Sequence, residues 1–205
     1  MNEHIAQLTK DYPRLESCAS QIDQAFDCLA GCFRSGGKLL LAGNGGSAAD
    51  CGHWAGELLK SFRSPRRLGG EDADKLGTGL ADRLQGGLPA VPLPSLTEFA
   101  TAWTNDCDPE YVFAQGVWAL GNPGDTLAAL STSGNSNNIL RAAETARAGG
   151  LKVLGLTGES GGGLAALCDV CIRVPKTQVH HVQQLHLPVY HCLCLMLEDE
   201  FFPDL

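Results

Sequence analysis

The chain has 205 residues with 44% apolar content, and 15 Lys and Arg against 23 Asp and Glu leave a formal net charge of −8. This length and composition fit one globular domain. The acidic balance argues against a nucleic-acid partner, since phosphate contacts need clustered Lys and Arg, and no apolar run is long enough to predict a membrane span.

The N-terminal half predicts helices around one buried strand. Apolar residues recur at helical spacing over 3–34, and Pro13 interrupts them, which indicates a helix or a helix pair. GGKLLLAGNGGS predicts turn, strand and turn, and SAADCGHWAGELLKSF predicts a helix. Residues 63–88 are rich in charge, Gly and Pro, so we expect an inserted loop with a single helical turn. A short strand, PAVPL, and two helices around TNDCD follow.

The C-terminal half alternates buried strands with helices. DTLAALS, LKVLGLTG and CDVCIRVP read as strands, and a long apolar helix, QVHHVQQLHLPVYHCLCLMLEDEFF, follows them. This rhythm is typical of a parallel sheet covered on both faces. We therefore predict an α/β fold over residues 1–205, a flavodoxin-like three-layer αβα sandwich with a parallel sheet of about five strands.

The nine cysteines suggest a reducing compartment rather than a disulfide framework. The polar N-terminal segment does not resemble a signal peptide, so we expect a cytoplasmic protein. Cys168 and Cys171 form a CxxC pair, and Cys192 and Cys194 form a CxC pair. A zinc knuckle is one interpretation, but we favour buried thiols that pack as small apolar side chains.

Two turns rich in Gly and Ser, GNGGS and STSGNS, each join a predicted strand to a helix. In open parallel sheets ligands bind beyond the carboxyl ends of the strands. Gly45 and Gly46 permit close backbone approach, and STSGNS carries four hydroxyl groups that suit a phosphate monoester: Ser131, Thr132, Ser133 and Ser136. The glycine spacing fits no dinucleotide or nucleotide-triphosphate loop, and an ordinary serine helix cap stays the alternative for STSGNS.

His53 and Glu57 are four residues apart on a predicted helix, so they share one face. An imidazole and a carboxylate at this spacing can hold zinc, although a surface hydrogen bond is the simpler interpretation. Gln183 and His191 lie eight apart, about 12 Å along an ideal helix, so they do not naturally meet at one ion. A kink at Pro188 is one remedy, and the spacing alone does not choose between His186 and His191.

The motifs LAGNGGSAAD, HWAGE, TND, STSGNS and VQQLHLPVYH, in this order, resemble the sugar isomerase (SIS) domain of the phosphoheptose isomerases. The resemblance covers nearly the whole chain. It implies isomerisation of sedoheptulose 7-phosphate to D-glycero-D-manno-heptose 7-phosphate through an enediol, and a homotetramer with active sites near subunit contacts. It also implies a zinc ion on His53, Glu57, Gln183 and His191.

The resemblance further implies substrate contacts and catalytic roles. Glu57 and His191 would move protons, and the phosphate would lie on the hydroxyl groups of STSGNS. The sugar would contact Asn44, Gly45, Gly46, Glu57, Asn105, Asp106 and Gln183. The chain departs from the family at Ser61, where an arginine is usual, and at His180 and His181, where an Asp-Arg pair is usual. Two alternatives therefore stay open: a non-catalytic SIS module, and an isomerase of another phosphosugar.

Overall fold

Five strands form one parallel sheet in the order β2-β1-β3-β4-β5 in the computed structural model, which describes residues 2–203. They are β1 (Leu39–Gly43), β2 (Ala90–Pro92), β3 (Thr126–Ser131), β4 (Lys152–Thr157) and β5 (Val170–Arg173). Every residue of β1 and β3 is buried, because helices cover both faces of the sheet. The predicted parallel α/β sandwich is confirmed.

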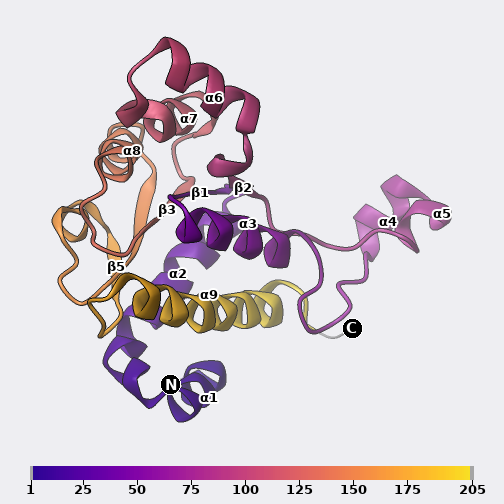
Figure 1. Ribbon diagram of the computed structural model, residues 1–205. Coiled ribbons are helices and arrows are strands. Elements are labelled where there is room, and N and C mark those ends of the chain that lie inside the picture. Colours follow the sequence, from indigo (N-terminus) through magenta and orange to yellow (C-terminus); the bar gives the residue numbers. More distant parts are fainter. Residues whose placement is uncertain (1, 204–205) are drawn as a thin grey trace.

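Two helical layers enclose the sheet (Figure 1). One contains α1 (Glu3–Asp11), α2 (Ala19–Arg34), α3 (Gly46–Leu59) and α9 (Val179–Phe201), with the 3-10 turn η1 (Pro13–Cys18) between the first two. The other contains α6 (Thr97–Asp106), α7 (Val112–Leu120) and α8 (Asn137–Ala148), with the short turns η2 (Leu93–Ser95), η3 (Pro109–Tyr111) and η4 (Gly163–Leu167). Alternate residues of β1 serve the two cores: Leu39 and Leu41 face the first layer, and Leu40 and Ala42 the second.

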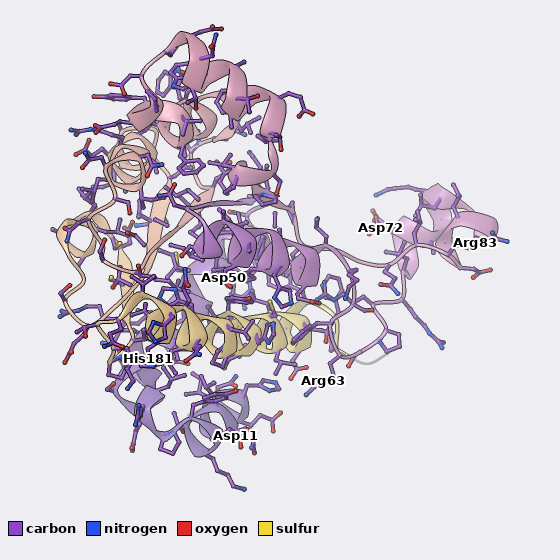
Figure 2. All side chains as sticks on the ribbon, viewed as in Figure 1. Asp11, Asp50, Arg63, Asp72, Arg83 and His181 are labelled. Atoms are coloured by element: carbon purple, nitrogen blue, oxygen red, sulfur yellow. The ribbon has the colours of Figure 1, made fainter. Side chains whose placement is uncertain are left out.

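An arm of two short helices, α4 (Gly70–Leu76) and α5 (Thr78–Ala81), projects from the body (Figure 1). Asp72 and Arg83 lie well away from the other labelled side chains in Figure 2. An antiparallel bridge between Arg67 and Gln85 closes the base of the arm. We expected a single helical turn in this segment, and the structure contains two helices, neither of which packs against the body.

Arg66 and Glu198 join the base of the arm to the body. Each is only 1% exposed, and Arg66 Nε donates to Glu198 Oε1 over 2.8 Å. The guanidinium also donates to the carbonyls of Glu57 and Leu58, at 3.1 and 2.7 Å, and so caps the end of α3. Backbone N–H groups of residues 62–64 donate to the Glu198 carboxylate. Burial acts to raise the pKa of Glu198, but these donors outweigh it and leave that pKa below the usual value.

None of the helices in residues 2–203 combines the length and apolar character that a membrane crossing requires.

Candidate active site

The two Gly-Ser turns lie side by side at the carboxyl edge of the sheet. β1 and β3 are neighbouring parallel strands, with Gly43 in register with Leu130. α3, which follows β1, covers one face of the sheet, and α8, which follows β3, covers the other. The crevice between two such strands is where ligands bind in open parallel sheets. Asn44 and Asn138, which follow these strands, exchange two amide hydrogen bonds of 2.9 Å and tie the turns together.

The GNGGS turn makes room for a side chain from α9. Gly45 has a φ of +54°, a conformation that favours glycine. A Cβ on Gly46 would lie 2.5 Å from Nε2 of Gln183, so only a residue without a side chain leaves space for this amide. Gln183 therefore lies against the turn, as a contact to a ligand bound there would require.

The STSGNS turn presents its hydroxyl groups at the start of α8. Ser131 Oγ and Ser136 Oγ lie 3.1 Å apart, Ser131 is buried, and Ser133 is exposed. Ser133 Oγ accepts a hydrogen bond from the backbone N–H of Asn135. Thr132, between Ser131 and Ser133, is half-buried. This arrangement is suited to an anion at a helix N-terminus.

His53, Glu57 and His191 come together between α3 and α9. His53 Nε2 is 3.3 Å from Glu57 Oε1, and the rings of His53 and His191 lie 5.0 Å apart at 87°. Nε2 of His191 is buried without a hydrogen-bond partner among the described residues. Burial lowers the pKa of His191, and the nearby His53 adds to this effect while Glu57 opposes it. The imidazole of His191 is therefore neutral near pH 7.

Tyr190 and Asp50 orient His53. The Tyr190 hydroxyl donates to Asp50 Oδ1 over 3.3 Å and lies 3.0 Å from Nδ1 of His53. Burial raises the pKa of Tyr190, with a further contribution from the charge of Asp50, so the hydroxyl keeps its proton. The Tyr190 hydroxyl thus holds Nδ1 of His53, which directs Nε2 of the same ring towards Glu57.

The positions of Gln183, His186 and His191 on α9 show which histidine faces His53. α9 runs as one helix through Pro188, with Gln183 at the GNGGS turn and His191 about two turns further, beside His53. No hydrogen bond between described residues joins Gln183 to the His53 cluster. His186 is fully buried, its Nε2 lies 3.3 Å from the Thr157 carbonyl, and burial lowers its pKa to about 4. His186 is therefore a core residue, and His191 faces the cluster.

Asn105 and Asp106 lie elsewhere. They end α6, in the opposite helical layer, and both are exposed. Asn105 Nδ2 donates to the neighbouring Asp106 Oδ1 over 2.8 Å. Within residues 2–203 neither side chain hydrogen-bonds to α3 or α9, so a single copy of the chain does not bring them to His53.

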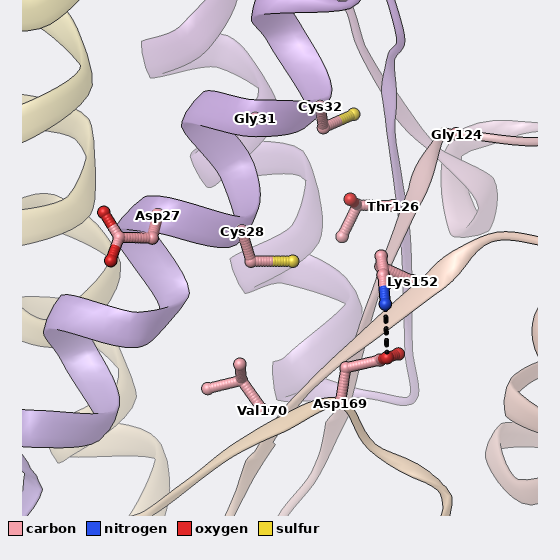
Figure 3. Close-up of a pocket in the computed structure, with 9 residues that line it drawn as sticks. All are labelled: Asp27, Cys28, Gly31, Cys32, Gly124, Thr126, Lys152, Asp169 and Val170. Atoms are coloured by element: carbon pink, nitrogen blue, oxygen red, sulfur yellow. Dashed lines mark hydrogen bonds and ion pairs between the residues drawn. The ribbon is translucent and has the colours of Figure 1, made fainter.

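A cavity of about 440 Å³ opens at the other edge of the sheet, between α2 and the beginnings of β3, β4 and β5 (Figure 3). Cys28 and Thr126 line it, and an ion pair of 2.9 Å between Lys152 and Asp169 closes one side. It lies at the amino ends of the strands, whereas ligands of such sheets bind at the carboxyl ends. The cavity is thus distinct from the candidate site.

Comparison with known proteins identifies the family. The chain is 43% identical to a phosphoheptose isomerase of Rhodospirillum rubrum over 186 residues, covering 91% of this chain and 89% of the relative. The chain belongs to the phosphoheptose isomerase family. It is an isomerase with an SIS domain, whose sequence profile matches residues 77–158.

Solved structures of phosphoheptose isomerases share the fold. The enzyme from Francisella tularensis superposes with a TM-score of 0.79 at 32% identity, covering 96% of this chain and 94% of that one. The enzyme from Neisseria gonorrhoeae gives 0.76, also at 32% identity, with 96% of each chain covered. The similarity therefore includes both helical layers and the sheet.

The departures from the family motif change the immediate surroundings of Glu57. Lys60 Nζ lies 3.0 Å from Glu57 Oε2 and donates to the carbonyl of Ser61. A cation thus stands beside this carboxylate although the chain lacks the usual arginine. His180 is exposed and His181 is half-buried, with ring centres 4.1 Å apart, and partial burial and the neighbouring imidazole lower the pKa of His181.

Three residues that complete the site were missed from sequence. Asp50 precedes His53 by almost one helical turn, and Tyr190 adjoins His191. Their spacing from the two histidines could have indicated that they lie near the site. Asn138 lies in an Asn-rich stretch whose partner, Asn44, is 94 residues away. No local pattern identifies that pairing.

Proposed function

We propose that the protein is an aldose–ketose isomerase that converts sedoheptulose 7-phosphate to D-glycero-D-manno-heptose 7-phosphate through an enediol. The observation that carries this proposal is the group of His53, Glu57 and His191 beside the switch-point turns. A proton-transfer reaction needs a carboxylate and an imidazole within reach of one substrate. The relatives named phosphoheptose isomerase support the choice of sugar.

The substrate phosphate would bind at STSGNS, through the hydroxyl groups of Ser131, Thr132, Ser133 and Ser136 and the N-terminal N–H groups of α8. The sugar would extend past Asn44, Gly45 and Gly46 towards Glu57, with Gln183 donating to its oxygens. This orientation follows from the order of the two turns along the edge and from the contact between Gln183 and Gly46.

Glu57 would take the proton from C1 of the ketose and return it to C2 of the enediol. The side chain is 16% exposed, so little water competes with the substrate. His191 would assist the transfer of the hydroxyl proton between O1 and O2 through the ring nitrogen that does not hold the ion. Asp50 and Tyr190 would hold His53 with Nε2 directed towards Glu57.

The donor set fits a divalent metal, and we propose zinc. Two imidazoles and one carboxylate face each other, and the orphaned Nε2 of His191 is a nitrogen that a metal would satisfy. His53, Glu57, Gln183 and His191 would hold the ion, which supplies Lewis-acid polarisation of the substrate carbonyl when bound.

A second cluster fits a metal less well. Among the described residues, Glu3, His4 and Asp199 have ligand atoms within 4.8 Å of one another. Asp199 already pairs with Arg63 over 2.7 Å and with His4 over 2.5 Å. A positive guanidinium on the same carboxylate disfavours a cation there.

Replacing His53 by Ala is expected to remove most of the zinc from purified protein, since metal ligands are individually worth a large part of the affinity. His186→Ala is the matched control, because it deletes an imidazole from the same helix pair without touching the cluster. Elemental analysis after dialysis, with circular dichroism to verify folding, measures the outcome. Equal zinc in the two variants would exclude the proposed ligand set.

We further propose a homotetramer in which a second copy supplies Asn105 and Asp106 to the site. Their exposure on α6 supports this, as does the arm, where Leu80 and Leu84 are 54% and 49% exposed. The free thiols support a reducing compartment, and we propose the cytoplasm.

Excision of residues 68–84, replaced by Gly-Gly between the bridged Arg67 and Gln85, is expected to yield a smaller assembly. The arm makes few contacts with its own body, so the subunit should keep its fold while the contact between copies is lost. Light scattering gives the mass, and the milder Leu80→Ser/Leu84→Ser variant should shift it in the same direction. An unchanged tetramer after excision would contradict this role.

The proposed activity is tested by incubating zinc-loaded protein with sedoheptulose 7-phosphate and following aldose formation by NMR. Pentulose and hexulose phosphates are tested as well, because Ser61, His180 and His181 depart from the family pattern. Conversion of another ketose phosphate alone would change the substrate. Tight binding without any conversion would favour a regulatory SIS module.

A further inference from the structure

The CxxC pair places two thiols together at the edge of the sheet. Cys168 follows η4, and Cys171 lies in β5, which borders β4 on one side only. A Cβ on Gly155 of β4 would lie 2.5 Å from the sulfur of Cys168 and 3.2 Å from that of Cys171. The two sulfurs therefore share the space that the missing side chain of Gly155 leaves free.

These thiols differ from most of the other cysteines. Cys18, Cys32, Cys51, Cys192 and Cys194 are buried and Cys107 is exposed, while Cys28 is half-buried and lines the cavity at the opposite edge of the sheet. Cys168 and Cys171 are both half-buried, so a small reagent can reach them. We expected them to pack as buried apolar residues; Cys168 does pack against the second core, but both thiols stay half-buried because they lie at the edge of the sheet.

Both thiols are connected to the STSGNS turn through residues that hydrogen-bond to it. The Cys168 thiol donates to the carbonyl of Leu164 over 3.2 Å, and the N–H of Leu164 donates to the carbonyl of Gly134, inside the turn, over 2.9 Å. The two segments are also closely packed, because a Cβ on Gly134 would come within 2.0 Å of the carbonyl oxygen of Gly161. A change at Cys168 therefore moves the segment on which the turn rests.

A second connection starts from Cys171. Its sulfur lies 3.7 Å from the Thr157 hydroxyl at the end of β4, and the following N–H, of Gly158, donates to the carbonyl of Thr132 over 3.0 Å. The turn that carries the four hydroxyl groups is thus held from both sides by residues that contact the thiol pair.

We propose that Cys168 and Cys171 form a reversible intramolecular disulfide, by exchange with a small-molecule disulfide, that weakens phosphosugar binding at STSGNS. The regulatory part rests on the proposed function. Bond formation requires the sulfurs to approach to about 2 Å. The Cys168 thiol then has no proton to donate to Leu164, so η4 loses that anchor.

The chemistry favours Cys171 as the attacking group. The pKa of Cys171 is lowered, mainly by the neighbouring Cys168 thiol, whose one proton can turn from the Leu164 carbonyl to a Cys171 thiolate, and the positive charge of Arg173 adds to this effect. The same hydrogen bond, together with burial, raises the pKa of Cys168. Cys171 is therefore the thiol of the pair that loses its proton more readily.

The exchange is balanced in two steps. The Cys171 thiolate attacks one sulfur of oxidised glutathione, forms a mixed disulfide and releases one glutathione thiolate. Cys168 then loses its proton and attacks the sulfur of Cys171, which releases the second glutathione thiolate. The two protein thiols are oxidised by two electrons, the reagent is reduced to two thiols, and the protons lost by the protein pass to the leaving groups.

The test uses the full chain with Cys28→Ser and Cys107→Ser, which remove the other half-buried thiol and the exposed one. Reduced protein is treated with oxidised glutathione, remaining thiols are blocked, and the protein is cleaved before Asp169, which lies inside the CxxC loop. A pair of peptides linked through Cys168 and Cys171 is expected. Cys168→Ser and Cys171→Ser, in the same background, should not give this product.

Function is measured on the same samples. Oxidation is expected to raise the KM for sedoheptulose 7-phosphate about tenfold, a typical coupling between two sites, with kcat nearly unchanged and full reversal by dithiothreitol. The two serine variants should show no response. Calorimetry with inorganic phosphate should show the same weakening.

The outcomes separate the two proposals. Absence of the linked peptide overturns the disulfide, and a disulfide that leaves phosphate affinity and KM unchanged overturns the coupling. If the reduced protein does not isomerise sedoheptulose 7-phosphate, the proposed function fails, while peptide mapping and phosphate calorimetry still decide the role of the thiols.

Discussion

Glu57→Gln is expected to reduce kcat for aldose–ketose isomerisation by about 10²- to 10⁴-fold, the range that a positioned general base contributes. The amide keeps the size of the side chain but cannot accept the C1 proton. Phosphosugar affinity should change little, because the phosphate is held at STSGNS on another strand. Stopped-flow or NMR turnover, with calorimetry for binding, measures both effects.

Two controls isolate the role of this carboxylate. Glu144→Gln removes an exposed carboxylate from α8 that pairs with Arg141, and turnover should stay at the wild-type level. Zinc content of Glu57→Gln is measured in parallel, since loss of metal would also lower kcat. If Glu57→Gln retains its zinc and turns over at nearly the wild-type rate, Glu57 is not the base.

Removing one partner of the buried pair Arg66–Glu198 is expected to lower the free energy of unfolding by about 3–5 kcal/mol, because it leaves an uncompensated buried charge. Arg66→Met tests this by urea unfolding followed by circular dichroism. The matched control is Arg63→Gln, which breaks the exposed pair with Asp199, where Arg63 is 53% exposed. That change should cost about 1 kcal/mol or less.

The double variant Arg66→Met/Glu198→Leu sharpens this prediction. Replacing both charges by apolar groups of similar size should recover much of the stability lost in Arg66→Met. Similar unfolding energies for Arg66→Met and Arg63→Gln would show that the buried pair is unimportant.

The same carboxylate makes stability depend on pH. The pKa of Glu198 is depressed in the folded protein, so its stabilising contribution is fully present above the pKa of the unfolded chain. That contribution is lost as the pH falls through the depressed folded value. Wild type should therefore lose stability more steeply on acidification than Glu198→Gln.

The fold was predictable because the local signals agree with one another. Runs such as Leu39–Gly43, apolar at every position, indicate strands covered on both faces, and each ends in a Gly-Ser turn before a helix. Adjacency of the two turns follows once the strands are parallel neighbours. The pairing of His53 with Glu57 follows from helical spacing.

The rest of the site depends on packing that the sequence does not display. The choice of His191 over His186 is made by which face of α9 lies on α3, and that is settled by Trp54 stacking on Tyr190. Both Gln183 and His191 reach α3 without a kink in α9, since each contacts a different turn of α3. Arg66 is a charged residue in a loop-like stretch, and its burial depends on Glu198, 132 residues away.

The pairing of α3 with α9 has a consequence for how activity arises during synthesis. α9 follows all five strands along the chain, and the hydrogen bond between His53 and Tyr190 spans 137 positions. Closing so long a loop is slow compared with forming local helices. Until α9 emerges from the ribosome and docks, Trp54 lacks the cover of Tyr190, so a change in its fluorescence and the onset of turnover should appear together.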